Sequence, residues 1–251
     1  MLLTIDIGNT TVSVGVYRDD LLVAKTAMGL DTKKTSYQFK SELALLLGEN
    51  LPLVTHSIIS SVVPTITATI SAALLELTET TPIVVSAGVK TGLKMKLSNS
   101  VNLGSDLVCA AVGAVNNYPL PAIVVDLGTA STITGIDNDG VLCGTSIMAG
   151  VEISLTALND HTAALPLTDV SPPEKLMGMN TKEAIKSGAI YGTASMVDGM
   201  CKRYEKELTN PSFIITGGYA KTIAPFCEAK FIVDQELIFK GLNAIFSKNT
   251  K

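Results

Sequence analysis

The feature that most constrains the fold is a strand-and-turn pattern that occurs twice. Residues 2–7 form an apolar segment that ends in an Asp-x-Gly sequence at Asp6, and a hydroxyl-rich turn and a second apolar segment follow. Residues 122–144 repeat this outline around Asp126. The 120 positions between Asp6 and Asp126 are a domain-sized interval. The repeat therefore predicts two related lobes.

Strand and helix patterns alternate through both parts of the chain. Helical spacing of apolar residues predicts helices at 36–47, 64–77, 104–115, 152–158 and 181–208. Short β-branched segments between them predict further strands at 57–63, 82–85 and 213–216. We therefore expect an α/β fold with an N-terminal lobe at 1–117 and a C-terminal lobe at 118–251.

Charge and hydropathy exclude several classes of function. Nineteen Lys and Arg residues against 23 Asp and Glu give a net charge of −4, and they form no basic block, so we expect no nucleic-acid partner. The longest apolar runs are far shorter than the ~20 residues that cross a bilayer, so we expect no membrane contact. Asp6 interrupts the segment where a signal peptide would be apolar. We expect a cytoplasmic protein.

Cysteine and histidine are scarce and scattered. The four cysteines form no C-x-x-C pair, which favours reduced thiols packed as small hydrophobic groups. Only His56 and His161 are available, so a histidine metal centre or a histidine-dependent triad is not expected.

The Asp-x-Gly turns carry the first sign of chemistry. Each turn places backbone N–H groups and hydroxyls beside one carboxylate, which suits a polyphosphate bound with Mg²⁺. Glycine lets the chain come close to the phosphates. An ordinary hairpin turn explains a single copy equally well. Two copies, one in each lobe, favour nucleotide phosphates held between them.

These turns belong to a larger family resemblance. DIGNT at 6–10, DLGTAST at 126–132 and TGG at 216–218 resemble the phosphate and adenosine loops of the acetate kinase, sugar kinase, Hsp70 and actin superfamily. Within it, the chain is similar to type III pantothenate kinase. Further signatures of that family follow in order: SSVVP at 60–64, KTGL at 90–93, G-x-D at 104–106, A-G-V at 149–151, MNTKEAIKSGAIYG at 179–192 and DQELIFKGL at 234–242.

The resemblance implies two actin-like (ribonuclease H-like) lobes with a nucleotide cleft between them. It implies a homodimer that phosphorylates pantothenate to 4′-phosphopantothenate, the first step of coenzyme A synthesis. The cofactors that it implies are ATP, Mg²⁺ and a monovalent cation, K⁺ or NH₄⁺.

The resemblance also implies roles for individual residues. Asp106 matches the general base, Asp126 the ligand of the monovalent cation, and Gly217 and Gly218 the adenosine loop. Asp6 would order the Mg²⁺ shell. The ATP-binding positions are Asp6, Ile7, Gly8, Asn9, Thr10, Thr11, Val12, Ser13 and Thr129. The pantothenate-binding positions are Gly104, Ser105, Asp106, Leu107 and Thr181, the last from the partner subunit of the dimer.

Three of these residues also have structural interpretations. Asp106 follows Gly104 at a predicted helix start and suits an N-cap. Asp126 suits a strand-end carboxylate that turn N–H groups satisfy. Asn180 or Thr181 suits the cap of the long helix that follows.

The chain departs from the family on the acceptor side. Leu107 stands where the family has an Arg that would bind the pantothenate carboxylate, and Leu97-Ser98-Asn99-Ser100 stands where it has Tyr-Asp-Asn-Pro. The segment 144–150 loses one Gly and a Pro, and Gln235 replaces a late Pro. The side chain of Lys90, Lys94 or Lys96 would replace the positive charge of the missing Arg, unless these lysines form a solvated strand face.

Three functions therefore stay open at the level of sequence. The chain is a pantothenate kinase with a rearranged pocket, a kinase for another small alcohol, or a weakly catalytic paralogue that binds nucleotide and acts as a regulator. An actin-like or chaperone-like ATPase is disfavoured, because 251 residues leave little room for the insertions of such proteins.

Overall fold

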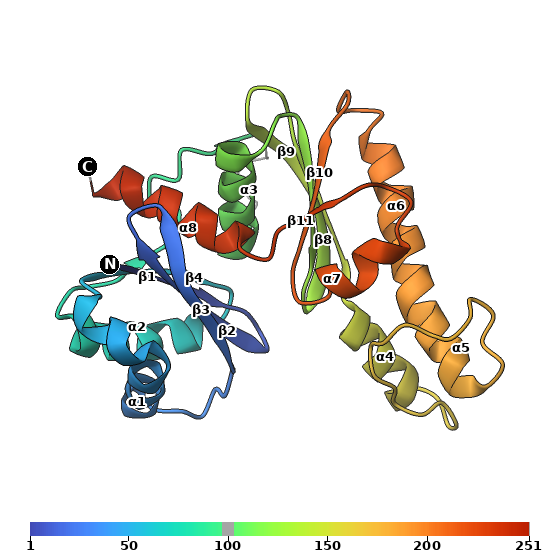
Figure 1. Cartoon of the computed structure of the whole chain (residues 1–251), viewed down its shortest axis with the longest axis horizontal. Coiled ribbons are helices and arrows are strands. Elements are labelled where there is room, and N and C mark those ends of the chain that lie inside the picture. The colour runs from blue at the N-terminus through green and yellow to red at the C-terminus, as the bar shows by residue number, and fades with distance from the viewer. Residues whose placement is uncertain (97–102, 251) are drawn as a thin grey trace. The chain divides into compact units, whose positions relative to one another are not determined.

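The computed structural model describes residues 1–96 and 103–250, which form two compact units (Figure 1). The first unit contains Met1–Leu93, helix α3 (Ser105–Asn117) up to Asn116, and helix α8 (Leu237–Asn249). The second contains Asn117–Glu236 and the short strand β6 (Lys94–Met95). This division differs from lobes at 1–117 and 118–251, because α8 packs on strands of the first unit.

A five-stranded mixed sheet forms the centre of the first unit. Its order is β3-β2-β1-β4-β5, with β1–β2 and β2–β3 antiparallel and β1–β4 and β4–β5 parallel. The strands are β1 (Leu2–Ile7), β2 (Thr11–Arg18), β3 (Leu21–Gly29), β4 (His56–Ser61) and β5 (Ile83–Val84). The two strands predicted on either side of the first Asp-x-Gly turn are confirmed as β1 and β2.

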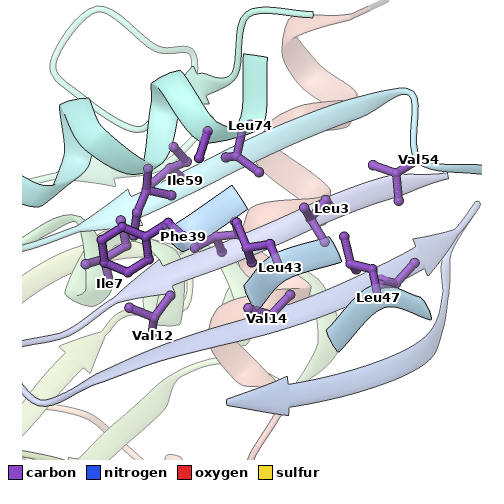
Figure 2. Packing of buried hydrophobic residues seen from close by; sticks show 14 of the residues in the cluster. Leu3, Ile7, Val12, Val14, Phe39, Leu43, Leu47, Val54, Ile59 and Leu74 are labelled. Atoms are coloured by element: carbon purple, nitrogen blue, oxygen red, sulfur yellow. The ribbon is translucent and has the colours of Figure 1, made fainter. Parts of the chain in front are cut away.

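Helices α1 (Ser36–Leu47) and α2 (Pro64–Thr78) cover one face of this sheet. Phe39 and Leu43 of α1 pack on β-branched and leucine side chains of β1, β2 and β4, and all are shielded from solvent (Figure 2). Thr35 and Gln38 form a capping box at the start of α1, and a 3₁₀ turn (Gly48–Leu53) follows the helix. Apolar side chains on alternate strand positions thus bury this face.

Helices α3 and α8 contribute the second core of the first unit. Val108, Cys109 and Val112 of α3 pack with Phe239 and Leu242 of α8, and Leu2 and Ile58 of the sheet belong to the same cluster. Successive side chains of β1 point alternately into the two cores. Asp6 therefore lies on the same face of the sheet as Leu2.

The second unit repeats the topology of the first. Its six-stranded sheet has the order β11-β10-β7-β8-β9-β6, so β7 to β11 occupy the places of β1 to β5. The strands are β7 (Ala122–Leu127), β8 (Ala130–Ile136), β9 (Val141–Ala149), β10 (Ser212–Thr216) and β11 (Ile232–Val233). The expectation of an α/β fold with two related halves is confirmed.

The second unit also contains a series of helical segments. They are α4 (Val151–Asp160), α5 (Thr181–Ser187), a π-helical turn (Gly188–Gly192), α6 (Thr193–Tyr204), α7 (Ala220–Ile223) and a 3₁₀ turn (Ala224–Phe226). Val197 and Cys201 of α6 pack on Ile123, Val125 and Ile215. The predicted helix at 181–208 is therefore three joined segments, and the last of them ends at Tyr204. Residues 205–208 form turns, in which their backbone N–H groups donate to the carbonyl oxygens of Cys201, Arg203 and Tyr204.

The structure also shows the state of the cysteines and the length of the apolar helices. All four cysteines are free, and Cys109 and Cys201 are buried, as expected for packed thiols. In the part of the chain that the structure describes, no helix has the length and apolar character to span a membrane.

We expect Gly241→Ala to destabilise the first unit. A Cβ at Gly241 would lie 1.9 Å from the carbonyl oxygen of Cys109, and one at Gly113 would lie 2.2 Å from that of Leu237, so the backbones of α3 and α8 touch. Forcing them apart costs about 1–3 kcal/mol. Urea denaturation followed by circular dichroism measures the loss.

The matched control is Gly199→Ala in α6, where the nearest atom to a new Cβ is the Arg203 side chain at 3.4 Å. That change gains up to about 1 kcal/mol from helix propensity. Equal unfolding midpoints for the two variants would contradict the close packing of α3 on α8.

Candidate active site

Asp6 lies at the carboxyl end of β1 among polar neighbours. The strand register pairs Asp6 with Ser13 on β2 and with Ser60 on β4. Side chains at paired positions of neighbouring strands point to the same face of a sheet. One carboxylate and two hydroxyls thus gather beside the first Asp-x-Gly turn.

The Asp6 carboxyl group is strongly perturbed by its surroundings. Burial raises its pKa, a hydrogen bond with the Ser60 hydroxyl lowers it, and the nearby Asp106 carboxylate raises it, and together these effects bring the pKa to about 7. Its Oδ1 atom is buried and has no hydrogen-bond partner within residues 1–96 and 103–250. A cation would supply the missing partner.

Asp106 lies in the first turn of α3, one residue inside the helix. Its Oδ1 accepts the Leu107 backbone N–H at 2.8 Å, and partial burial raises its pKa. The interpretation of Asp106 as an N-cap is wrong, because the helix already begins at Ser105. The carboxylate is half-buried, and its raised pKa suits it to accept a proton.

The residues that flank Asp106 anchor it to the end of β4. The Ser105 hydroxyl donates to the Ser61 carbonyl oxygen at 2.9 Å and accepts the Ser61 N–H at 2.7 Å. A Cβ at Gly104 would lie only 2.3 Å from the Asp106 Oδ1, so glycine leaves room for the carboxylate. Leu107 is buried, with 8% of its surface exposed. Leu97–Ser100 lie outside the described residues.

The first turn presents mainly backbone and hydroxyl groups. Gly8 donates its N–H to the Thr11 carbonyl at 2.9 Å, and Asn9, Thr10 and Thr11 are exposed. The side chains of Ile7 and Val12 lie wholly in the core. Within this predicted ATP-binding segment, Ile7 and Val12 therefore have only backbone groups to offer a nucleotide.

The second turn repeats this arrangement around Asp126. The register pairs Asp126 with Thr132 on β8 and with Thr216 on β10. Gly217 has a φ of +92°, and a Cβ there would lie 2.4 Å from the Asp126 Oδ1. Gly217 therefore lies directly against Asp126 and leaves no room for a side chain, whereas Gly218 is exposed with open space around it.

Thr129 lies in the same turn and is closely packed against the start of α4. A Cβ at Gly150 would lie 2.2 Å from the Thr129 carbonyl oxygen, so a glycine is needed at this helix start. Thr129 is half-buried and belongs to the second unit, as Asp126 does.

Thr181 is exposed at the first position of α5. The cap of this helix is Asn180, whose side chain accepts the Glu183 N–H at 3.0 Å. Thr181 also lines a mainly apolar cavity of about 570 Å³ between α4 and the α5–α6 segment. Ser154, Leu155, Leu158, Gly188 and Met196 line it as well. The helix-cap interpretation thus holds for Asn180 and leaves the Thr181 side chain at the cavity.

Lys96 is engaged in an ion pair with Asp137, with an Nζ–Oδ2 distance of 2.8 Å. This pair lowers the pKa of Asp137 to about 2. The side chains of Lys90 and Lys94 are exposed, as expected of a solvated face.

The Asp6 carboxylate fits a divalent cation. Carboxylate oxygen is the ligand that Mg²⁺ prefers, and Asp6 offers a buried one that has no hydrogen-bond partner in the described structure. Over the described parts of the chain, no group of three or more His, Cys, Asp and Glu side chains forms a ready-made metal cage, so a bound nucleotide would have to complete the Mg²⁺ shell.

Comparison with known proteins decides the family. The family model described as type III pantothenate kinase matches residues 2–203. The chain belongs to the type III pantothenate kinase family. The type III pantothenate kinase of Halalkalibacterium halodurans is 35% identical over 99% of this chain and 100% of its own. That of Geotalea daltonii is 34% identical over 99% of both. As a member of this family the protein is a kinase.

Solved structures agree on the fold. A Campylobacter jejuni protein described as a Baf family transcriptional activator superposes with a TM-score of 0.63 at 19% identity, covering 98% of both chains. Component A of the (R)-2-hydroxyglutaryl-CoA dehydratase of Acidaminococcus fermentans gives 0.57 at 15% identity, covering 100% of this chain and 99% of its own. At such identities the likeness concerns the fold alone.

One neighbour of Asp6, Ser60, could not be predicted from the motifs of the type III pantothenate kinases. It is part of the SSVVP signature, which by itself indicates no contact with Asp6. Its place beside Asp6 follows from the parallel pairing of β1 with β4, which residues far apart in the chain decide.

We expect Asp6→Asn to stabilise the protein above neutral pH when Mg²⁺ and nucleotide are absent. The folded pKa of about 7 exceeds the ordinary value of 3.8, so the folded state loses stability as pH rises between these values. Asparagine removes this loss, which reaches up to about 4 kcal/mol. Thermal unfolding at pH 4 and pH 8 measures it, with a gain in melting temperature at pH 8 and little at pH 4. An equal shift at both pH values would show that Asp6 does not titrate in this range.

Proposed function

We propose that the protein transfers the γ-phosphoryl group of ATP to the primary hydroxyl of pantothenate, which yields 4′-phosphopantothenate and ADP. The observation that carries the proposal is the alignment of nearly the whole chain with curated type III pantothenate kinases, in a chain that retains both Asp6 and Asp106. The reaction would begin coenzyme A synthesis in the cytoplasm, where the four free cysteines stay reduced.

Asp106 is the proposed general base. It accepts the proton of the pantothenate hydroxyl and orients the attacking oxygen, while the bond between the γ-phosphorus and the ADP oxygen breaks. Its raised pKa favours this role, since a carboxylate that titrates closer to neutral pH is a stronger base.

Asp6 and the turn that follows it are the proposed ATP-phosphate site, together with Ser13 and Thr129. Bound Mg²⁺ would neutralise the charge that develops on the phosphates. Asp6 would face this cation through its unpartnered Oδ1. Asp126 is the proposed ligand of K⁺ or NH₄⁺, and the Gly217 and Gly218 backbone is the proposed adenosine contact.

A second candidate acceptor follows from Leu107. This residue is buried and uncharged where the family has an Arg, and Lys96 is already paired with Asp137. Loss of a charge-assisted contact to a carboxylate lowers affinity. A small alcohol without a carboxylate would suit such a pocket. The remaining alternative is a protein that binds nucleotide, transfers no phosphoryl group and acts as a regulator.

The decisive experiment measures ADP release with ATP, Mg²⁺ and K⁺, with and without pantothenate. We expect pantothenate-dependent ADP, and we expect Asp106→Asn to lower kcat by at least about 100-fold while nucleotide affinity changes little, because general-base catalysis typically contributes 10²–10⁴-fold. Full activity of the variant would remove Asp106 from the mechanism.

Omission of K⁺ and the variant Asp126→Ala complete the experiment. Both should weaken ATP binding, and the variant should no longer respond to K⁺. ADP formation with another alcohol but not with pantothenate would establish the second candidate. Measurable nucleotide binding without any transfer would establish a regulator.

We also propose a homodimer in which Thr181 reaches the pantothenate of the partner. Large exposed apolar side chains occur on β9, on α4 and in the segment before α5 of the second unit. They are Ile147, Ile153, Leu158, Leu167, Leu176, Met177 and Met179. Met177 and Met179 are 81% and 86% exposed, and the cavity lined by Thr181 is mainly apolar. Exposed apolar side chains of this kind suit an interface with a second copy of the chain.

Met179→Glu should therefore shift the protein from dimer to monomer, because a carboxylate in an apolar interface must be desolvated. Light scattering after size exclusion measures the mass. Leu45→Glu on α1, at an 83% exposed leucine of the first unit, is the matched control and should leave the mass unchanged. A dimer that survives Met179→Glu, or a wild-type monomer, would contradict the proposed surface.

A further inference from the structure

We propose that Tyr219 is a positioning residue, which holds the glycine turn (Gly217 and Gly218) in place for a nucleotide through a hydrogen bond to Glu152 on α4. The Tyr219 hydroxyl donates this bond to the Glu152 Oε1 atom. The inference rests on the proposed function for the role of the glycine turn as the adenosine contact. Tyr219 touches no nucleotide in this proposal and acts through the backbone of the two glycines that precede it.

The strand register brings Tyr219 and the start of α4 to the same end of the second sheet. β10 ends at Thr216, which pairs with Asp126 near the end of β7, and the glycine turn and Tyr219 follow. β9 ends at Ala149, which pairs with Ala130 at the start of β8, and α4 follows. Because the second Asp-x-Gly turn joins β7 to β8, Tyr219 and the start of α4 both flank that turn.

Backbone contacts fix one side of the glycine turn. The Tyr219 N–H donates to the Leu127 carbonyl oxygen at 3.1 Å. Gly217 has a φ of +92°, and a Cβ there would lie 2.6 Å from the Leu127 backbone nitrogen. The turn therefore lies directly on the end of β7. Gly218 is exposed with open space around it, so its backbone is the part of the turn that a ligand can approach.

The hydrogen bond to Glu152 fixes the other side of the turn. The ring of Tyr219 is half-buried and packs against the apolar core of the second unit. Glu152 lies in the first turn of α4, where a Cβ at Gly150 would lie 2.2 Å from the Thr129 carbonyl oxygen. Tyr219 thus links the glycine turn to a helix that is itself in close contact with the second Asp-x-Gly turn.

The Tyr219 hydroxyl is a permanent donor in this link. Burial and the hydrogen bond to Glu152 both raise its pKa, so it keeps its proton at neutral pH. A turn that is already ordered does not have to be ordered by its ligand, which lowers the entropy cost of binding. Loss of the bond should therefore weaken nucleotide binding, although no group that contacts the nucleotide is removed.

The test compares Tyr219→Phe with Tyr191→Phe in the binding of ADP with Mg²⁺, followed by isothermal titration calorimetry. Tyr219→Phe should raise the Kd about threefold to tenfold, the range expected for one net hydrogen bond. Tyr191 is also half-buried in the second unit, and its ring packs edge-on against Phe226 with 5.1 Å between the centroids. The Tyr191 variant should bind ADP as the wild type does. In steady-state kinetics, Tyr219→Phe should raise the KM for ATP by a similar factor while kcat changes by less than about twofold.

Two variants of Glu152 test the partner of the bond. Glu152→Gln keeps an oxygen that accepts the Tyr219 proton and should bind ADP within about twofold of wild type. Glu152→Ala should match Tyr219→Phe, and the double variant should bind no more weakly than either single variant. Unchanged affinity of Tyr219→Phe, or additive losses in the double variant, would overturn this inference alone. A wild-type protein that binds no ADP would overturn the proposed function as well, whereas the identity of the acceptor does not affect a binding measurement without transfer.

Discussion

Two carboxylates that lie near each other, Asp6 and Asp106, are the constraint on which the rest of the first unit depends. Burial and mutual repulsion raise the pKa of Asp6 to about 7, so the charged form is costly until a cation is bound. A fold optimised for stability alone would avoid this arrangement. Retaining it makes sense for a site that binds a metal–nucleotide complex and moves a proton.

The supports of this pair are small polar and glycine residues. Ser105 links the start of α3 to the end of β4 through two hydrogen bonds to Ser61, and Gly104 leaves space for the Asp106 carboxylate. Farther along, Gly113 lets α3 touch the backbone of α8. The helix that carries Asp106 is thus fixed at its start by hydrogen bonds and along its length by close packing. Rigid support of this kind is what positions catalytic groups.

The repeated topology explains why equivalent side chains recur. The same strand order places a carboxylate at the end of the first strand of each sheet, with hydroxyl residues paired on both sides of it. The two turns nevertheless differ in detail. Asp6 has a buried oxygen without a hydrogen-bond partner in the described structure, whereas the Asp126 carboxylate lies against Gly217, where no side chain would fit. The repeated topology thus gives the two carboxylates different surroundings.

The sequence by itself determined the local elements and the identity of the chemical groups. Alternating apolar residues, the Asp-x-Gly turns and the repeat predicted strands β1, β2, β7 and β8 and two related halves, since these patterns depend on neighbouring residues. Only the tertiary structure decided which distant residues meet. It placed α8 with the first unit, Ser60 beside Asp6, and Lys96 against Asp137. Such contacts depend on parallel pairing and helix packing across long stretches of chain, which no local pattern encodes.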